Sequence, residues 1–220
     1  MIVLYDYALS GNCYKVRQLL AWLDVEYKKA PIDFYPGFEH RGDAFLEINP
    51  LGQIPVLNDN GEIIRDAQAI LVHLAANYDR SGKWYPVNQP RRLGQIQSWL
   101  AFADSLTATC SAARLHDAMF FPIDIERARA GAERLLRVLD EHVWYCERRG
   151  WSWLCEGDQP TIADLACFPY VALCEEGGIS QLPYPAVMRW VERFMRLDGF
   201  QPMAGMLPLP LTKNITSHTV

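Results

Sequence analysis

The strongest constraint on the fold of this chain is a change in sequence pattern at residues 81–90, a segment with one glycine and two prolines. Before it, short strand-like runs alternate with helical ones, whereas after it almost every apolar stretch has helical spacing. Because each pattern needs its own core, the 220 residues predict two small domains. We assign these domains to residues 1–80 and 91–200, with a linker at 81–90 and a tail at 201–220.

The first part has the pattern of a small α/β layer domain. Strand-like runs at 2–5 and 25–29 flank a helical segment that starts at Asn12. Two further short runs surround an Asn/Asp/Gly turn at 58–61, which is typical of a β-hairpin. Another helix opens at Asp66. This mixed order predicts a sheet covered by helices rather than a helical bundle.

The second part is predicted to be all-helical. Apolar residues recur at spacings of three and four within 93–107, 128–143, 161–173 and 187–194. We expect five or six helices in this domain.

Composition limits the class of function. The formal net charge of −5 argues against nucleic acid or an anionic membrane as the main partner. Neither a signal-like start nor a membrane-spanning apolar run occurs. The six cysteines form no C-x-x-C pair, and the histidines and carboxylates show no metal-ligand spacing. We expect a cytoplasmic protein without a metal, in which most cysteines are buried as small apolar residues.

Pro55 interrupts a strand-like run, where proline removes a ladder hydrogen bond. A cis Ile54–Pro55 bond would turn the N–H and C=O of Ile54 outward, toward an extended peptide. The alternative is an ordinary edge-strand proline.

The corner at Asp66 and Ala67 has two interpretations. Unpaired N–H groups at the start of a helix suit a carboxylate, and Asp66 would attract an amine, so the corner matches the two charges of an amino acid. The alternative is that Asp66 only caps the helix.

The segment 10–17 joins the first strand to the first helix. A ligand thiolate placed here would be stabilised by the helix terminus and by a hydroxyl donor. Ser10 is the obvious donor, and Asn12 and Cys13 are alternatives. Ser10 or Asn12 could instead serve only as a helix cap.

These segments together resemble the glutathione S-transferase family. The motifs S-x-x-x-x-K-V-R (10–17), N-P-x-G-Q-I-P-V-L (49–57), D-N-G-x-I-I (59–64) and D-A-x-A-I-x-x-H-L (66–74) occur in the family's order. In the second half, residues 157–165 resemble the start of the family's buried helix, with Thr161 and Asp164 forming a capping box. The resemblance covers residues 1–200 and implies a thioredoxin-like N-terminal domain followed by an all-helical domain.

The resemblance implies a glutathione site. Ser10 matches the activating hydroxyl of serine-type members, and Ile54 would pair with the glutathione backbone across a cis Pro55. Asp66 and the N–H of Ala67 would hold the γ-glutamyl end. Family members usually carry Ser or Thr at the position of Ala67, so one hydroxyl contact is missing here.

Two further residues are candidate contacts of the tripeptide. Gln53 and His40 could each bind the glycine carboxylate or the γ-glutamyl group.

The resemblance also implies a pocket for an electrophilic, apolar second substrate and a two-fold homodimer. We place this pocket on the first helix of the second domain and the loop after the first strand: Tyr7, Trp99, Phe102, Ala103, Leu106 and Thr109.

Three functions follow from these features. The first is transfer of the glutathione thiolate to an electrophilic carbon. The second is a glutathione-dependent thiol–disulfide oxidoreductase that uses Cys13, and the third is a non-catalytic glutathione-binding or scaffold protein, suggested by Ala67. The isomerase pattern of the zeta class has a cysteine where Asn12 stands, which weakens that reading.

Overall fold

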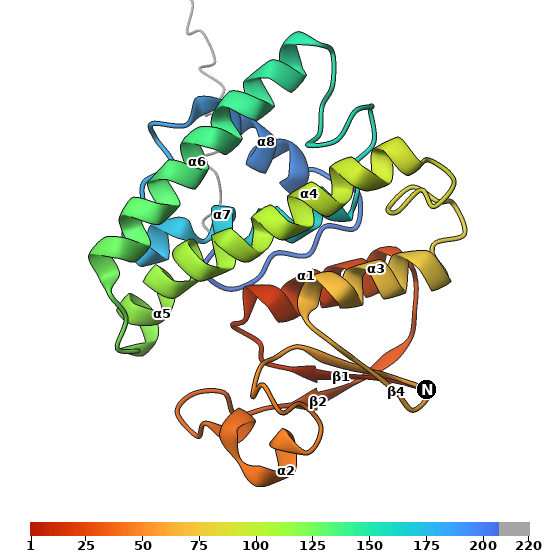
Figure 1. Ribbon diagram of the computed structural model, residues 1–220, viewed down its shortest axis with the longest axis vertical. Helices are drawn as coiled ribbons and strands as arrows, with labels where there is room; N and C mark the ends of the chain where they lie inside the picture. Colours follow the sequence, from red (N-terminus) through yellow and green to blue (C-terminus); the bar gives the residue numbers. More distant parts are fainter. Residues whose placement is uncertain (207–220) are drawn as a thin grey trace, which may run out of the picture.

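The computed structural model describes residues 1–206 and begins with a four-stranded mixed sheet (Figure 1). The strands follow the order β2-β1-β3-β4 across the sheet. Their bounds are β1 (Ile2–Asp6), β2 (Tyr27–Pro31), β3 (Val56–Asp59) and β4 (Glu62–Arg65). β1 pairs in parallel with β2 and antiparallel with β3, and β3 and β4 form the predicted hairpin.

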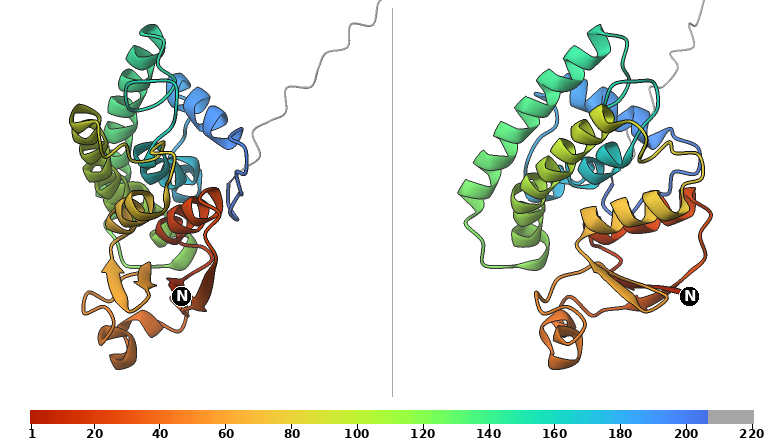
Figure 2. Two further views of the ribbon diagram at one scale, coloured as in Figure 1. Left: turned by 90° about the vertical axis from the view of Figure 1, so that its right-hand side faces the viewer. Right: turned by 45° about the vertical axis from the view of Figure 1, so that its right-hand side comes forward.

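Two helices, α1 (Gly11–Trp22) and α3 (Ala67–Tyr78), cover the face of the sheet that is turned toward the rest of the chain (Figure 1). They do so because α1 buries Val16, Leu19 and Leu20, and α3 buries Ile70 and Leu71 on its sheet side. A single 3₁₀ turn, Glu39–Arg41, and the short α2 (Asp43–Leu46) lie beyond the opposite side of the sheet (Figure 2).

The second domain is helical, as its spacing predicts. Its elements are α4 (Pro90–Leu106), a π-helical turn (Thr107–Ser111), α5 (Ala112–Met119), α6 (Ile125–Arg148), α7 (Ile162–Ala172), a 3₁₀ turn (Cys174–Gly177) and α8 (Pro185–Met195). α7 is buried along its whole length, since α1, α4 and α8 all pack against it. The predicted fold class, a thioredoxin-like domain followed by an all-helical domain, is confirmed.

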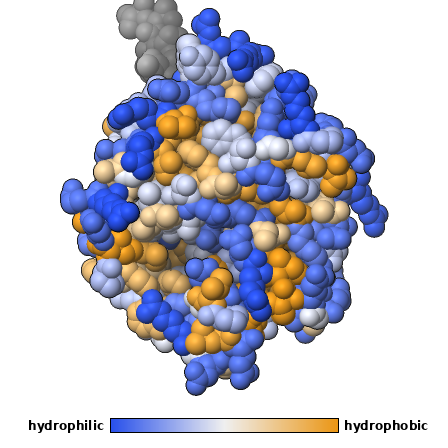
Figure 3. Space-filling view, viewed as in Figure 1, coloured by the Kyte–Doolittle hydropathy of each residue, from blue (hydrophilic) through white to orange (hydrophobic). Residues whose placement is uncertain are grey.

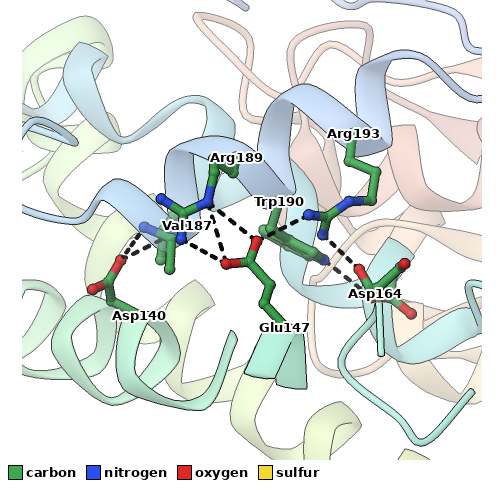
Figure 4. Close-up of polar contacts among 9 residues, drawn as sticks. Asp140, Glu147, Asp164, Val187, Arg189, Trp190 and Arg193 are labelled. Carbon is green, nitrogen blue, oxygen red and sulfur yellow. Dashed lines mark hydrogen bonds and ion pairs between the residues drawn. The ribbon is translucent and has the colours of Figure 1, made fainter. Parts of the chain in front are cut away.

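The start of α7 is fixed by a buried carboxylate. The predicted capping box is present, and Asp164 accepts hydrogen bonds from the backbone N–H groups of Thr161 and Leu154, both at 3.0 Å. Trp190 Nε1 on α8 donates to the same carboxylate at 3.1 Å. Figure 4 shows this contact next to the ion pairs of Glu147 with α8. The carboxylate therefore joins three segments of the helical domain.

Two local predictions shift by one or two residues, because the chain needs a turn before each strand. The N–H of Val25 donates a hydrogen bond to Leu20 C=O at the end of α1, and β2 begins two residues later, at Tyr27. β3 begins at Val56, directly after Pro55. All six cysteines are buried and unpaired, as expected. Among residues 1–206, no helix combines the length and the hydropathy needed to span a bilayer.

Candidate active site

A cleft of about 670 Å³ lies between the two domains. The loops that follow β1 and precede β3, together with the start of α3, form one wall, and α4, the π-helical turn and α5 form the other. Figure 3 shows the surface hollowed between the domains on this face, with hydrophobic and hydrophilic residues at its border. The predicted residues Tyr7, Ser10, Asn12, His40, Gln53, Ile54, Pro55, Asp66 and Ala67 all line this cleft.

The loop before β3 carries the predicted cis bond between Ile54 and Pro55. Asn49 Nδ2 donates to Gln53 C=O at 2.7 Å and so holds this loop against the end of α2. Ile54 precedes the first residue of β3, and its backbone is outside the strand ladder.

The start of α3 confirms that Asp66 caps the helix, and Asp66 also lines the cleft. Asp66 is the N-cap, and its Oδ1 accepts hydrogen bonds from Gln68 N at 2.9 Å and Ala69 N at 3.0 Å. Ala67, the first helical residue, has an N–H with no intrahelical acceptor. Asp66 has a φ of 72°, an uncommon conformation for a residue other than glycine, and such residues are concentrated at functional sites.

The start of α1 places Ser10 and Asn12 on the same cleft. Ser10 is the N-cap, and its Oγ accepts a hydrogen bond from Cys13 N at 3.2 Å, which leaves the hydroxyl proton available for donation. Asn12 N–H donates to Tyr170 Oη of α7 at 3.1 Å. Gly11 allows this approach, because a Cβ there would lie 2.7 Å from the Tyr170 ring.

Cys13 does not line the cleft, which corrects its prediction as an accessible thiol. It is fully buried beneath the first turn of α1, in a small core with Ile32, Phe45 and Val56. Burial and, secondarily, the Asp6 carboxylate raise the pKa of the Cys13 thiol to about 12. The helix terminus does not produce the reactive thiolate that the sequence suggested.

Of the six predicted second-substrate residues, only Tyr7 lines the cleft. Ala103 and Leu106 are fully buried in the core, and Trp99 packs on Phe102 and His142 with ring centroids 5.0 and 4.5 Å away. Thr109 Oγ1 donates to Ser105 C=O. These five residues pack within the helical domain and do not line the cleft.

The cleft face of the second domain was missed by the sequence prediction. It consists of Asp104, Thr107, Ala108, Ser111, Arg114, Leu115, Met119 and Tyr170, and Phe34 adds to the first wall. Asp104, Thr107, Ala108 and Ser111 follow the spacing of one helical face. The signal that could have identified it is Asp104, the one carboxylate of α4.

Charge is unevenly distributed along the cleft. Gln68 Nε2 donates to the Asp104 carboxylate, and burial, with the nearby Asp66, raises the pKa of Asp104. Two carboxylates therefore lie near the start of α3. Arg114 on the opposite wall donates from Nη1 to Leu9 C=O at 2.7 Å and pairs with Glu176.

His40 is at the other end of the first wall. Its side chain is only 3% exposed and stacks on Phe34 with ring centroids 4.1 Å apart. Burial and the neighbouring Arg41 lower the pKa of His40, so the ring is neutral near pH 7. Within residues 1–206, His40 Nδ1 has no hydrogen-bond partner. An unpartnered buried nitrogen in a cleft is a feature that a ligand can complete.

No group of three or more His, Cys, Asp or Glu side chains in the described part of the chain is arranged to hold a metal ion. The polar groups of the cleft are backbone donors, hydroxyls, amides, two carboxylates, the His40 imidazole and the guanidinium groups of Arg41 and Arg114, and this mixture of charges suits a peptide-like zwitterion.

Comparison with known proteins agrees with this geometry. Residues 4–83 match the glutathione S-transferase N-terminal domain, and residues 123–198 match the glutathione S-transferase C-terminal domain. Maleylacetoacetate isomerase of Rhizobium meliloti is 29% identical over 205 residues, which cover 90% of this chain and 93% of that protein.

Solved structures give the same result. A glutathione S-transferase from Pseudomonas fluorescens has a TM-score of 0.82 at 27% identity, covering 92% of this chain and 98% of that one. Ure2p in complex with glutathione has a TM-score of 0.78 at 28% identity, covering 90% and 95%. With both of its domains matched in order, the chain belongs to the glutathione S-transferase family.

Proposed function

We propose that this protein binds glutathione in the interdomain cleft and transfers its thiolate to an electrophilic carbon of an apolar small molecule. The observation that carries the proposal is the combination of groups in one cleft. The N–H of Ala67 and two carboxylates lie at one end, and the hydroxyl of Ser10 lies beside the start of α1. A tripeptide with an amino-acid end and a central thiol needs these groups together.

The γ-glutamyl end fits the start of α3. Its α-ammonium would lie against Asp66 and Asp104, and its α-carboxylate would accept the N–H of Ala67. The backbone of the cysteinyl residue would pair with Ile54, and the glycine carboxylate would lie near Gln53 and His40.

The thiol then reaches the start of α1. Hydrogen bonds from Ser10 Oγ–H, together with the partial positive charge of the helix terminus, stabilise the thiolate and lower the pKa of the bound thiol. The thiol proton goes to solvent, and the sulfur electron pair forms the S–C bond as the electrophile loses a leaving group or takes up a proton. Tyr7, Leu115 and Met119 provide the apolar wall on which the electrophile would be held.

The alternative with a specific observation in its favour is binding without catalysis. Ala67 lacks the hydroxyl that would add a hydrogen bond to the bound carboxylate. The Cys13 oxidoreductase is disfavoured because this thiol is buried outside the cleft. We further propose that the protein is cytoplasmic and forms a homodimer. Gel filtration at several concentrations tests the homodimer, for which an apparent mass of twice 25.1 kDa is expected.

Calorimetric titration with glutathione, followed by a pH titration of thiolate absorbance, tests the proposal on wild type and Ser10→Ala. Transferase function predicts that glutathione binds and that the pKa of its bound thiol lies below the pKa of free glutathione. In Ser10→Ala, the pKa of the bound thiol should be higher than in wild type. Binding with an unshifted thiol pKa supports the non-catalytic alternative, and absence of binding at millimolar glutathione contradicts both.

A further inference from the structure

Lys15 is a fully buried cation that the proposed mechanism does not yet use. It lies on α1, one turn after Asn12, between α1, α3 and α7. Its Nζ donates to Asn12 Oδ1 at 2.8 Å and to Gln68 Oε1 at 3.3 Å, and it lies 5.2 Å from the centroid of the Tyr170 ring. Burying an ammonium group is costly, so its contacts must satisfy it well.

The ammonium group dictates how two amide side chains are oriented. Lysine has three donors and no acceptor, so an amide in contact with it must present its carbonyl oxygen. Gln68 shows the consequence, because its oxygen faces Lys15 while its NH₂ group donates to Asp104 at the cleft. One cation thus fixes an amide donor at the γ-glutamyl end.

The same constraint applies to Asn12 at the thiol end. Its oxygen accepts from Lys15, so its NH₂ group is turned away from the cation, and Asn12 lines the cleft beside Ser10. Its backbone is held independently by the bond from its N–H to Tyr170 Oη. No oxygen of residues 1–206 accepts a hydrogen bond from that NH₂ group.

We propose that Lys15 is a positioning residue that locks the Asn12 carboxamide so that its NH₂ group donates to the bound glutathione thiolate. Ser10 and Asn12 are then two donors to one sulfur, and only the second depends on a buried cation. The inference rests on the proposed function, because it requires glutathione in this cleft.

The charges around Lys15 fit this role. Asp66 and Asp104 are the carboxylates that act on it, and the thiol of Cys167 faces it from α7. These carboxylates favour the charged form of Lys15, which keeps it a donor to Asn12 Oδ1. Loss of Lys15 would therefore free the Asn12 amide.

The test is the pKa of bound glutathione, from thiolate absorbance at saturating ligand, in wild type, Lys15→Met, Asn12→Ala and the double variant. We expect each single variant to raise the bound-thiol pKa by about one pH unit. Since Lys15 acts through Asn12, adding Lys15→Met to Asn12→Ala should change the value little further. Lys28→Met, at an exposed position on β2, is the matched control and should leave it unchanged.

Two results overturn the proposal. One is a Lys15→Met protein that folds and binds glutathione with the wild-type thiol pKa. The other is a change in bound-thiol pKa on Lys15→Met that is as large in the Asn12→Ala protein as in wild type. If Lys15→Met does not fold, Asn12→Asp decides: it keeps an acceptor for Lys15 but replaces the NH₂ donor with a carboxylate. The thiol pKa should then rise more than in Asn12→Ala, and an unchanged value contradicts the proposal. A wild-type protein that does not bind glutathione refutes the proposed function itself.

Discussion

Two helices of this protein begin next to an aspartate, and the two aspartates are used in opposite ways. At α7, Asp164 is fully buried, and its oxygens accept from Thr161 N, Leu154 N and Trp190 Nε1. At α3, Asp66 lines the cleft, and one of its oxygens accepts both backbone N–H groups of the cap.

The difference separates a structural helix start from a ligand-binding one. The three donors to Asp164 all have their acceptor within the protein, so this site leaves none of them for a ligand. The start of α3 retains the Ala67 N–H and borders two carboxylates on the cleft. An aspartate near a helix start therefore has different mutational effects at N3 with all its partners inside the protein, as in Asp164, and at the N-cap beside the cleft, as in Asp66.

The largest expected effect is that of Asp164→Ala on stability. The substitution leaves three buried donors without an acceptor, and each unsatisfied buried group costs about 1–3 kcal/mol. We expect the free energy of unfolding, measured by urea denaturation, to fall by at least ~3 kcal/mol. Glutathione affinity of the remaining folded protein should be unchanged, and a loss below ~1 kcal/mol would contradict the structural role.

The next largest effect is expected from Lys15→Met, between α3 and α7, on the pH dependence of the free energy of unfolding. Burial lowers the pKa of Lys15 to about 8 from its usual 10.5. Between these pH values the unfolded chain binds more protons than the folded one, so this group makes the protein more stable as pH rises. Lys15→Met removes that contribution.

The free energy of unfolding of wild type should therefore rise relative to that of Lys15→Met between pH 8 and pH 10.5, by an amount on the order of 3 kcal/mol. Denaturation of both proteins at the two pH values measures it, with Lys28→Met as control. A difference that does not change with pH would show that Lys15 is not a desolvated cation.

Asp66→Ala should separate binding from stability at the other helix start. Loss of a charged partner for the ligand ammonium costs about 1.5–3 kcal/mol, which weakens glutathione binding roughly 10- to 100-fold. Loss of the cap lowers the free energy of unfolding by only about 1 kcal/mol. Calorimetry and denaturation on the same preparation test both values. Wild-type affinity in this variant would exclude the proposed γ-glutamyl position.

The smallest expected effect is a gain. Ala67→Ser adds a hydroxyl at the first residue of α3, where the bound carboxylate is expected, and should tighten glutathione binding up to tenfold. Thermal stability should hardly change, because serine is tolerated in the first helical turn. Equal affinity of the two proteins would indicate that the backbone N–H alone holds the carboxylate.

Features set by local chemistry could be predicted from the sequence. Pro55 in a strand-like run, Asp66 before a helix and the Thr161–Asp164 capping box each depend on neighbouring residues, and the structure has them as predicted.

Features set by packing could not be predicted in the same way. Which face of α4 borders the cleft depends on how that helix packs against α7, and Trp99 and Phe102 do not line the cleft. The burial of Cys13 depends on Ile32 and Phe45, which come from later segments. The full burial of Lys15 likewise depends on α3 and α7, which come from later segments.

The most direct test of the account is a crystal structure of the protein with glutathione. The account predicts that the α-carboxylate accepts the Ala67 N–H, that the α-ammonium contacts Asp66 and Asp104, and that the sulfur lies within hydrogen-bond distance of Ser10 Oγ. A tripeptide bound with its glycine end at α3, or bound outside the interdomain cleft, would contradict it.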